Sequence, residues 1–228
     1  MCLSVAAASA REKLLDASLS LIRERGYAAT TVDELCARAG VTKGAFFHHF
    51  ASKDALGVAA VAHWSHHASA LFQAEAYRQA PDALGRVRAY LALRKSLLHG
   101  DVSQFTCVAG TMVQETYASH PALRQACADC IFGHAGTLAQ DFAAAMKERG
   151  LHGDVTAEGL AAHTQCVLQG AFVLAKARGD GQVAVQSVEH LERYVELLFA
   201  GTPESPAKPK SRPRRKPSTA PSRKRRSP

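Results

Sequence analysis

The feature that most constrains this chain is a pair of helices near its N-terminus, each with its own start and stop signals. Thr31 and Glu34 have the spacing of a capping box, in which each side chain accepts a hydrogen bond from a backbone donor. Gly40 ends that helix, since glycine tolerates the left-handed conformation found there. Thr42 then caps a helix that runs to about His49. Helices of about seven residues are unstable alone in water, so their neighbours must hold them.

The rest of the folded chain also has helical patterns. A mostly apolar face recurs at helical spacing between Ser9 and Arg25, and Ser52 caps a long helix that begins at Lys53. Further helices are expected over residues 82–99, 104–117, 121–149, 156–179 and 183–199. We find no strand pattern and no internal repeat, and therefore predict an all-α fold of about nine helices.

Two short helices joined by a glycine-containing turn are typical of a helix-turn-helix, in which the second helix enters the major groove of DNA. Thr42, Lys43 and Gly44 would lie at the N-terminus of that second helix, where free amides and the helix dipole attract a phosphate. Gly44 leaves room for the sugar-phosphate surface. The core beneath would come from Leu35, Val41, Phe46 and Phe50.

Residues 201–228 explain the net charge of +8. Ten of them are Lys or Arg and one is acidic, which leaves 18 basic and 19 acidic residues in the rest of the chain. Seven of the nine prolines also lie here, and a segment so poor in large apolar side chains is expected to be disordered. This tail either contacts DNA phosphates without sequence preference or acts as a solubilising extension.

Residues 9–58 carry a family signature, made of the segments Gly26–Leu35, Ala39–Phe50 and Ser52–Leu56. In order, spacing and residue type they resemble the TetR family of transcriptional regulators. The resemblance implies an all-helical homodimer with an N-terminal helix-turn-helix domain and a larger C-terminal domain for effector binding and dimerisation. It implies a repressor that a small-molecule or reactive effector releases from a palindromic, double-stranded operator.

The resemblance also assigns roles to single positions. Ala45 and His48 would face base edges, and Lys53 would hold a phosphate at the start of the next helix. Phe47 departs from the family, which usually has a tyrosine there, so a hydrogen bond to phosphate is lost. His49 fits a packing or solvent role as well as a DNA contact. The predicted DNA-binding residues are Thr31, Thr42, Lys43, Gly44, Ala45, His48 and Lys53.

An effector pocket in the C-terminal helices follows from the same resemblance. Effector binding would change the spacing of the two recognition helices, so that both half-sites are no longer reached together. The sequence does not identify the effector. Residues that suit either the pocket wall or the core are Phe72, Tyr90, Leu93, Phe105, Met112, Tyr117, Phe142 and Phe172.

Cys107 lies in a segment, residues 105–124, that resembles a branch of the family with repressors that sense electrophiles or oxidants. A sensing thiol needs a lowered pKa, most simply from a nearby cation, and Lys176 is the candidate partner. The alternative is a buried, inert cysteine.

Two other classes of protein fit parts of the sequence. Cys127, Cys130 and His134 share one helix face, and His63 with His67 forms a second pair, but such patterns are weak signals for metal. We predict no metal site and no cofactor. The sequence has no glycine-rich phosphate loop and no nucleophile elbow, which argues against an enzyme. An architectural DNA-binding protein that acts through the basic tail is the main alternative. A helical thiol or metal enzyme, which would have to use Cys107 or Cys127, is a less favoured one.

The last two predicted helices should form the dimer interface, because a two-fold four-helix packing buries apolar stripes. The stripe residues are Val167, Gly170, Ala171, Leu174, Leu191, Val195 and Leu198. The expected domains are residues 9–55 for DNA binding, 56–200 for effector binding and dimerisation, and 201–228 as the tail. Six cysteines without a disulfide pattern and no apolar run of membrane-spanning length indicate a cytoplasmic protein that does not enter membranes.

Overall fold

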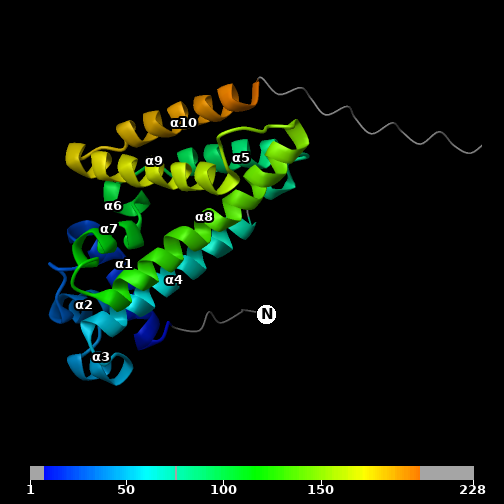
Figure 1. The fold of residues 1–228 in the computed structure, drawn as a ribbon. Coiled ribbons are helices and arrows are strands. Elements are labelled where there is room, and N and C mark those ends of the chain that lie inside the picture. The colour runs from blue at the N-terminus through cyan, green and yellow to red at the C-terminus, as the bar shows by residue number, and fades with distance from the viewer. Residues whose placement is uncertain (1–7, 75, 201–228) are drawn as a thin grey trace, which may run out of the picture.

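The computed structural model describes residues 8–74 and 76–200, and all regular structure there is helical (Figure 1). This confirms the predicted all-α fold. The helices are α1 (Ala10–Arg25), α2 (Val32–Ala39), α3 (Lys43–His49), α4 (Lys53–Ala74), the 3₁₀ helix η1 (Ala76–Gln79), α5 (Ala83–Ser96), α6 (Val102–Phe105), α7 (Val108–Thr116), α8 (Pro121–Arg149), α9 (Ala157–Arg178) and α10 (Gln182–Ala200). None of these described helices is both long and apolar enough to cross a membrane. The predicted basic tail lies outside the described residues.

Local hydrogen bonds set the ends of the first three helices. In the predicted capping box, the Glu34 amide donates to Thr31 Oγ1 at 3.2 Å and the Thr31 amide donates to Glu34 Oε2 at 2.9 Å. Gly40 follows α2 with a φ of 64°, the left-handed conformation that glycine adopts without a steric penalty. Thr42 Oγ1 then accepts from the Ala45 amide at 3.1 Å and starts α3.

One apolar core joins the N-terminal helices to the rest of the molecule. Leu14, Leu35 and Phe46 are fully or almost fully buried in it. Met112 of α7 and Leu123 of α8 belong to the same cluster. The helix-turn-helix unit therefore rests directly on α7 and α8, and packing is continuous across the expected boundary at residues 55 and 56.

A second apolar core lies between α5, α8, α9 and α10. Figure 1 shows α4 and α8 running side by side from the N-terminal unit toward this core, with α9 and α10 beyond them. A movement among α8, α9 and α10 can therefore reach the N-terminal unit through packed helices.

The predicted helix over residues 104–117 is in fact two helices, α6 and α7. Thr106 and Cys107 separate them with extended backbone, at ψ values of 159° and 126°. Cys107 caps α7, since the Gly110 amide donates to its sulfur at 3.4 Å. The Thr106 side chain is fully buried, so tertiary packing fixes a break that helical periodicity does not reveal.

Candidate nucleic-acid interface and adjoining pocket

Helix α3 packs against the core with its inner face and exposes its outer face to solvent. Phe46 is buried under the helix, with its ring centroid 5.1 Å from that of Phe47 and 6.0 Å from that of Phe50. Contacts with α1 and α2 hold this seven-residue helix in place. The residues left on the exposed face are Thr42, Lys43, Gly44, Phe47, His48 and His49, while Ala45 is half-buried.

The start of α3 is open to an approaching molecule. A Cβ atom added to Gly44 would meet only Thr42 Oγ1, at 3.7 Å. Phe47 is 57% exposed and projects from the same helix. Thr31, by contrast, uses its hydroxyl and its amide in the cap of α2, so its DNA contact stays a prediction.

Lys43 has a partner that sequence reasoning missed. Its Nζ lies 2.7 Å from Asp33 Oδ1 of α2, and the hydrogen bond to Asp33 raises the pKa of Lys43. Both side chains are exposed, and exposed ion pairs are weak. A phosphate can therefore compete with Asp33 for the ammonium at little cost.

Lys53 is tied to its own chain. Its Nζ donates to the backbone oxygens of Tyr27 and Thr30, each at 3.1 Å, and lies 4.3 Å from the centroid of the Tyr27 ring. An ammonium has three protons to donate, so one remains for the predicted phosphate contact. The contacts present give Lys53 a structural role in the loop between α1 and α2.

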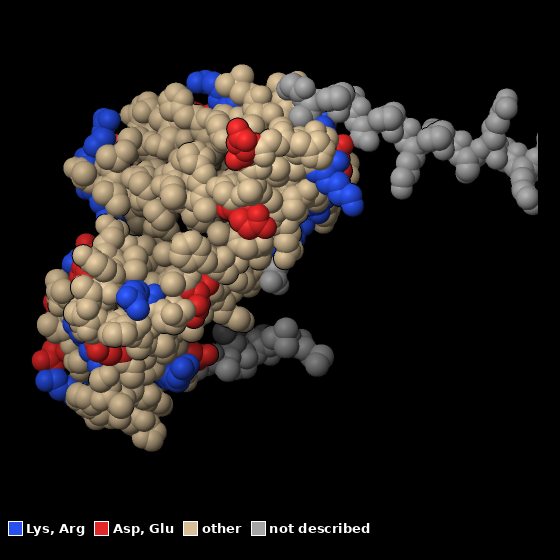
Figure 2. Space-filling model, in the orientation of Figure 1, with Lys and Arg blue, Asp and Glu red and all other residues tan. Residues whose placement is uncertain are grey.

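Charges near α3 largely cancel within the folded part of the chain. Arg25 pairs with Glu34 at 2.5 Å, and Arg38 pairs with Glu24 at 2.9 Å. In the view of Figure 2, Lys and Arg lie next to Asp and Glu at the N-terminal end, and the tip of that end is mainly uncharged. The excess of basic residues in the sequence lies instead in residues 201–228, outside the described part of the chain.

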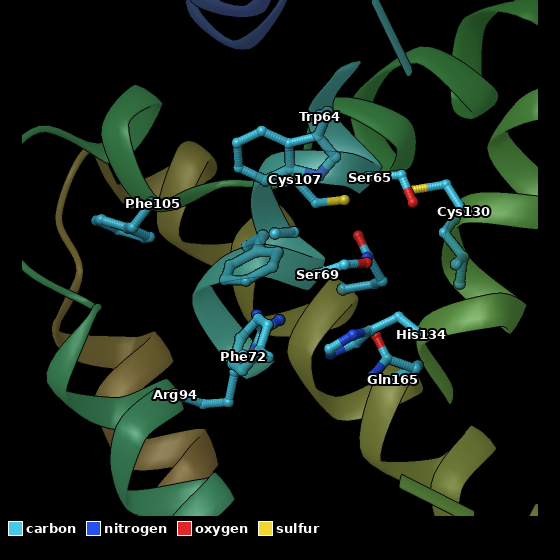
Figure 3. A pocket seen from close by; sticks show the side chains of 14 residues that line it. Trp64, Ser65, Ser69, Phe72, Arg94, Phe105, Cys107, Cys130, His134 and Gln165 are labelled. Atoms are coloured by element: carbon cyan, nitrogen blue, oxygen red, sulfur yellow. The ribbon is translucent and has the colours of Figure 1, made fainter. Parts of the chain in front are cut away.

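Two adjoining cavities lie between the C-terminal helices, about 60 Å³ and about 350 Å³ in volume. We call them the inner and the outer cavity. They share the wall residues Trp64, Ala68, Phe72, Arg94, Phe105 and Phe172. Figure 3 shows the inner cavity, with Cys107 and Cys130 on one side and His134 with Gln165 on another.

The predicted pocket residues are only partly brought together. Phe72, Phe105, Phe172 and Cys107 line the inner cavity. Tyr90 and Met112 line neither cavity and are buried in the two cores. Outside both cavities, Leu93 is half-buried, Phe142 is core and Tyr117 is exposed.

Lys176 lies away from the pocket. Its Nζ donates to Thr111 Oγ1 at 2.7 Å, and it lines a separate cavity of about 420 Å³ with Arg23 and Glu115. Burial lowers the pKa of Lys176. Among the described residues no hydrogen bond joins Lys176 to Cys107, but the two groups interact electrostatically, so their pairing stays a prediction.

Sequence reasoning missed the polar part of the pocket. His134 Nε2 lies 2.9 Å from the Tyr90 hydroxyl, and burial, with Arg94 and Arg78 adding to it, lowers the pKa of His134 to about 4. His134 is therefore neutral at pH 7. The sequence does carry a signal for Arg94. Arg94 continues the helical spacing of the buried residues Val87 and Leu91 along α5, which places it on the inward face of that helix.

The two cysteines of α8 lie in buried surroundings. Burial raises the pKa of Cys127 to about 12 and that of Cys130 to about 11. Cys127 lies in the N-terminal core, while Cys130 and His134 line the inner cavity. Within the described part of the chain, no group of three or more His, Cys, Asp or Glu residues could hold a metal ion.

Comparison with known proteins agrees with this architecture. Residues 14–60 match the family model described as bacterial regulatory proteins, tetR family. Residues 83–188 match the C-terminal domain model of LmrA/YxaF-like transcriptional regulators. A crystal structure of a regulatory protein TetR from Rhodobacter sphaeroides shares the fold, with a TM-score of 0.73 and 24% identity over 82% of this chain and 99% of that one.

Two curated relatives match short stretches of this chain. The uncharacterized HTH-type transcriptional regulator YerO of Bacillus subtilis is 44% identical over 46 residues, which are 20% of this chain and 16% of YerO. The HTH-type transcriptional repressor KstR2 of Rhodococcus jostii is 44% identical over 46 residues, which are 20% of this chain and 22% of KstR2. The chain thus spans less than a quarter of the length of either relative. With both domain models matched in order along one shared fold, the chain belongs to the TetR family of bacterial regulatory proteins.

Proposed function

We propose that the protein is a transcriptional repressor that binds a palindromic operator as a homodimer and leaves it when an effector binds. The observation that carries the proposal is the placement of α3. Its inner face is locked by Phe46, while Lys43, Gly44 and His48 face solvent at a point that no other described side chain covers. A short, rigidly held helix with an open N-terminus suits the major groove and the phosphates beside it.

The proposed partner is a second copy of this chain, which supplies a second recognition helix. Four large apolar side chains on α9 and α10 are exposed, namely Val173, Leu174, Tyr194 and Leu197. Figure 2 shows the part of the molecule formed by these helices as mainly uncharged in this view. Exposed apolar surface of this kind marks an interface.

The stripe that we predicted for this interface needs correction. Ala171, Leu191 and Val195 are buried in the cores of their own chain, and Val167 and Leu198 pack against one of them. Gly170 and Leu174 are exposed as expected. Helical spacing identified apolar faces on both helices but could not tell the inward from the outward residues.

The inner and outer cavities are the proposed effector site. Helices α4, α5, α8 and α9 all contribute wall residues, and α4 and α8 also carry the N-terminal unit. Sensing of a reactive electrophile by Cys107 remains part of the proposal, because the thiol lines the inner cavity and caps α7. As a regulator that acts on the chromosome, the protein would work in the cytoplasm and catalyse no reaction.

Selection of bound fragments from random duplex DNA tests the proposal. The wild-type chain should enrich an inverted repeat, and a chain that ends at residue 200 should enrich the same repeat with weaker salt dependence. Gly44→Trp should abolish enrichment, because the indole would occupy the space of the DNA backbone. Gly133→Trp, at an open position on α8, is the matched control and should leave the repeat unchanged.

Two results would contradict the repressor proposal. Enrichment of an inverted repeat by Gly44→Trp would show that α3 does not contact the operator. Loss of all binding upon removal of residues 201–228, with no repeat in the wild type, would favour an architectural protein that acts through its tail.

A further inference from the structure

Arg94 is the feature of the pocket that the proposed function does not explain. It lines both the inner and the outer cavity, and none of the other described Lys, Arg, Asp or Glu residues lines either of them. Among the described residues Arg94 makes no ion pair. Within this part of the chain, the two cavities therefore share one half-buried cation without a counter-charge.

The Arg94 guanidinium is held in place by aromatic rings. Its central carbon lies 5.2 Å from the centroid of Phe72 and 5.9 Å from that of Tyr90. Such stacking restrains the planar guanidinium and leaves its N–H groups free to donate to a ligand that lies in the plane of the group. His134 adds no second positive charge at neutral pH, because its pKa is lowered to about 4.

Gln165 also lines the inner cavity, and its amide interacts with the Tyr90 hydroxyl. Gln165 is 7% exposed, and its Nε2 makes no hydrogen bond of ordinary geometry although Gln165 lies near the Tyr90 hydroxyl. A buried amide nitrogen without an acceptor is costly, so a ligand oxygen at this point would be favoured. Figure 3 shows Arg94 and Gln165 at the lower left and lower right of the view, with Phe72 between them.

The outer cavity has a mixed wall. Leu71, Leu97 and Leu98 give it an apolar part together with the shared Trp64 and Phe105, while His67, His99 and Gln104 are polar wall residues. Its larger volume suits the body of a ligand, while the inner cavity has room only for a small polar group.

We infer that the effector is a small organic monocarboxylate with an apolar body, and that Arg94 and Gln165 bind its carboxylate group. This inference rests on the proposed function, since it names the ligand of the effector site. The positive charge of one guanidinium balances the negative charge of one carboxylate. Two parallel N–H groups of the guanidinium can donate to the two carboxylate oxygens. A phosphate dianion would leave excess negative charge beside a single guanidinium.

The chain supplies its own probe for a binding test. Trp64 is the only tryptophan, and it lines both cavities. Its fluorescence can be followed in the full-length protein, without DNA, while hexanoate, hexanamide, 1-hexanol or inorganic phosphate is added. We expect saturable binding of hexanoate, at least tenfold weaker binding of hexanamide and hexanol, and no binding of phosphate.

Variants assign the selectivity to single residues. Arg94→Gln should weaken hexanoate binding at least tenfold while hexanamide binding stays within twofold, which also shows that the pocket is intact. Gln165→Leu should weaken hexanoate binding to a smaller extent, about three- to tenfold. Arg124→Gln, which removes the same charge from an exposed position on α8, should bind hexanoate as the wild type does.

The carboxylate inference is overturned if the wild type binds hexanoate and hexanamide equally, binds neither, or if Arg94→Gln keeps full affinity for hexanoate. The first comparison uses only the wild-type chain, so it decides the matter even if a variant fails to fold. Because no DNA is present, this outcome is independent of operator selection. Failure of the repressor proposal would appear in the selection experiment alone.

Discussion

Lys53 shows how a single side chain can serve the fold at a position where the family resemblance implies a DNA contact. Its ammonium closes the loop between α1 and α2 through the backbone oxygens of Tyr27 and Thr30. We expect Lys53→Met to lower the free energy of unfolding by about 2 kcal/mol, since two hydrogen bonds from a charged donor are lost. Urea denaturation measures this. Lys13→Met, at an exposed position on α1, is the control and should have almost no effect. A fully stable Lys53→Met that binds DNA weakly would instead assign Lys53 to phosphate contact alone.

His134 should make stability depend on pH. Burial lowers its pKa to about 4, against about 6.5 in an unfolded chain. Between these values the unfolded state binds a proton that the folded state does not, so the free energy of unfolding must fall as the pH decreases from 6.5 to 4. The loss attributable to His134 is up to about 3 kcal/mol.

His134→Gln isolates this contribution, because glutamine does not titrate and can still hydrogen-bond to the Tyr90 hydroxyl. We expect the stability difference between the variant and the wild type to change in favour of the variant as the pH falls. Chemical denaturation at pH 7, 6, 5 and 4.5 measures this difference. A constant difference across that range would show that His134 titrates alike in both states.

At the scale of elements, α7 connects the pocket to the helix-turn-helix unit. Its N-cap, Cys107, lines the inner cavity. Toward its other end, the Glu115 carboxylate accepts from the amides of Tyr27 and Ala28 at 3.3 Å and 2.7 Å. Gly26 makes this approach possible, because a Cβ there would clash with the Glu115 carboxylate. One short helix thus touches both the pocket and the loop that precedes α2.

Glu115→Ala should loosen this connection. We expect the Tyr27 and Ala28 amides to exchange with deuterium about tenfold faster, and the free energy of unfolding to fall by about 1 kcal/mol. Hydrogen exchange resolved by NMR tests both amides directly. Glu189→Ala, at an exposed position on α10, is the control. Unchanged exchange at both amides would mean that Glu115 does not hold the loop.

Helix ends were predictable where the signals are local. Thr31 with Glu34, and Thr42 with the Ala45 amide, act within one turn, so their capping could be inferred from spacing alone. The break before α7 depends on the burial of Thr106, which only the tertiary structure determines. The cavities were harder still to predict, because their walls come from five helices, α4, α5, α6, α8 and α9, that are far apart in the chain. Sequence therefore identified α3 and the wall residues Phe72, Phe105 and Phe172, but missed Trp64, Arg94 and Gln165.

At the scale of the whole molecule, the exposed apolar side chains of α9 and α10 should hold two chains together. Leu197 is 71% exposed, so replacing it by glutamate costs little within one chain but buries a charge in a dimer. We expect Leu197→Glu to be monomeric at concentrations where the wild type is dimeric. Sedimentation velocity distinguishes the two states. Tyr117→Glu, which alters an exposed aromatic residue near the end of α7, is the control and should remain dimeric.

The central claim is that two copies of α3 contact one duplex at the same time. Hydroxyl-radical footprinting of the wild-type chain on its selected DNA, with the stoichiometry taken from sedimentation, tests this most directly. We expect two chains per duplex and two protected segments on one face of the DNA, one helical turn or a multiple of it apart. One chain per duplex, or even protection along DNA of any sequence, would contradict the account.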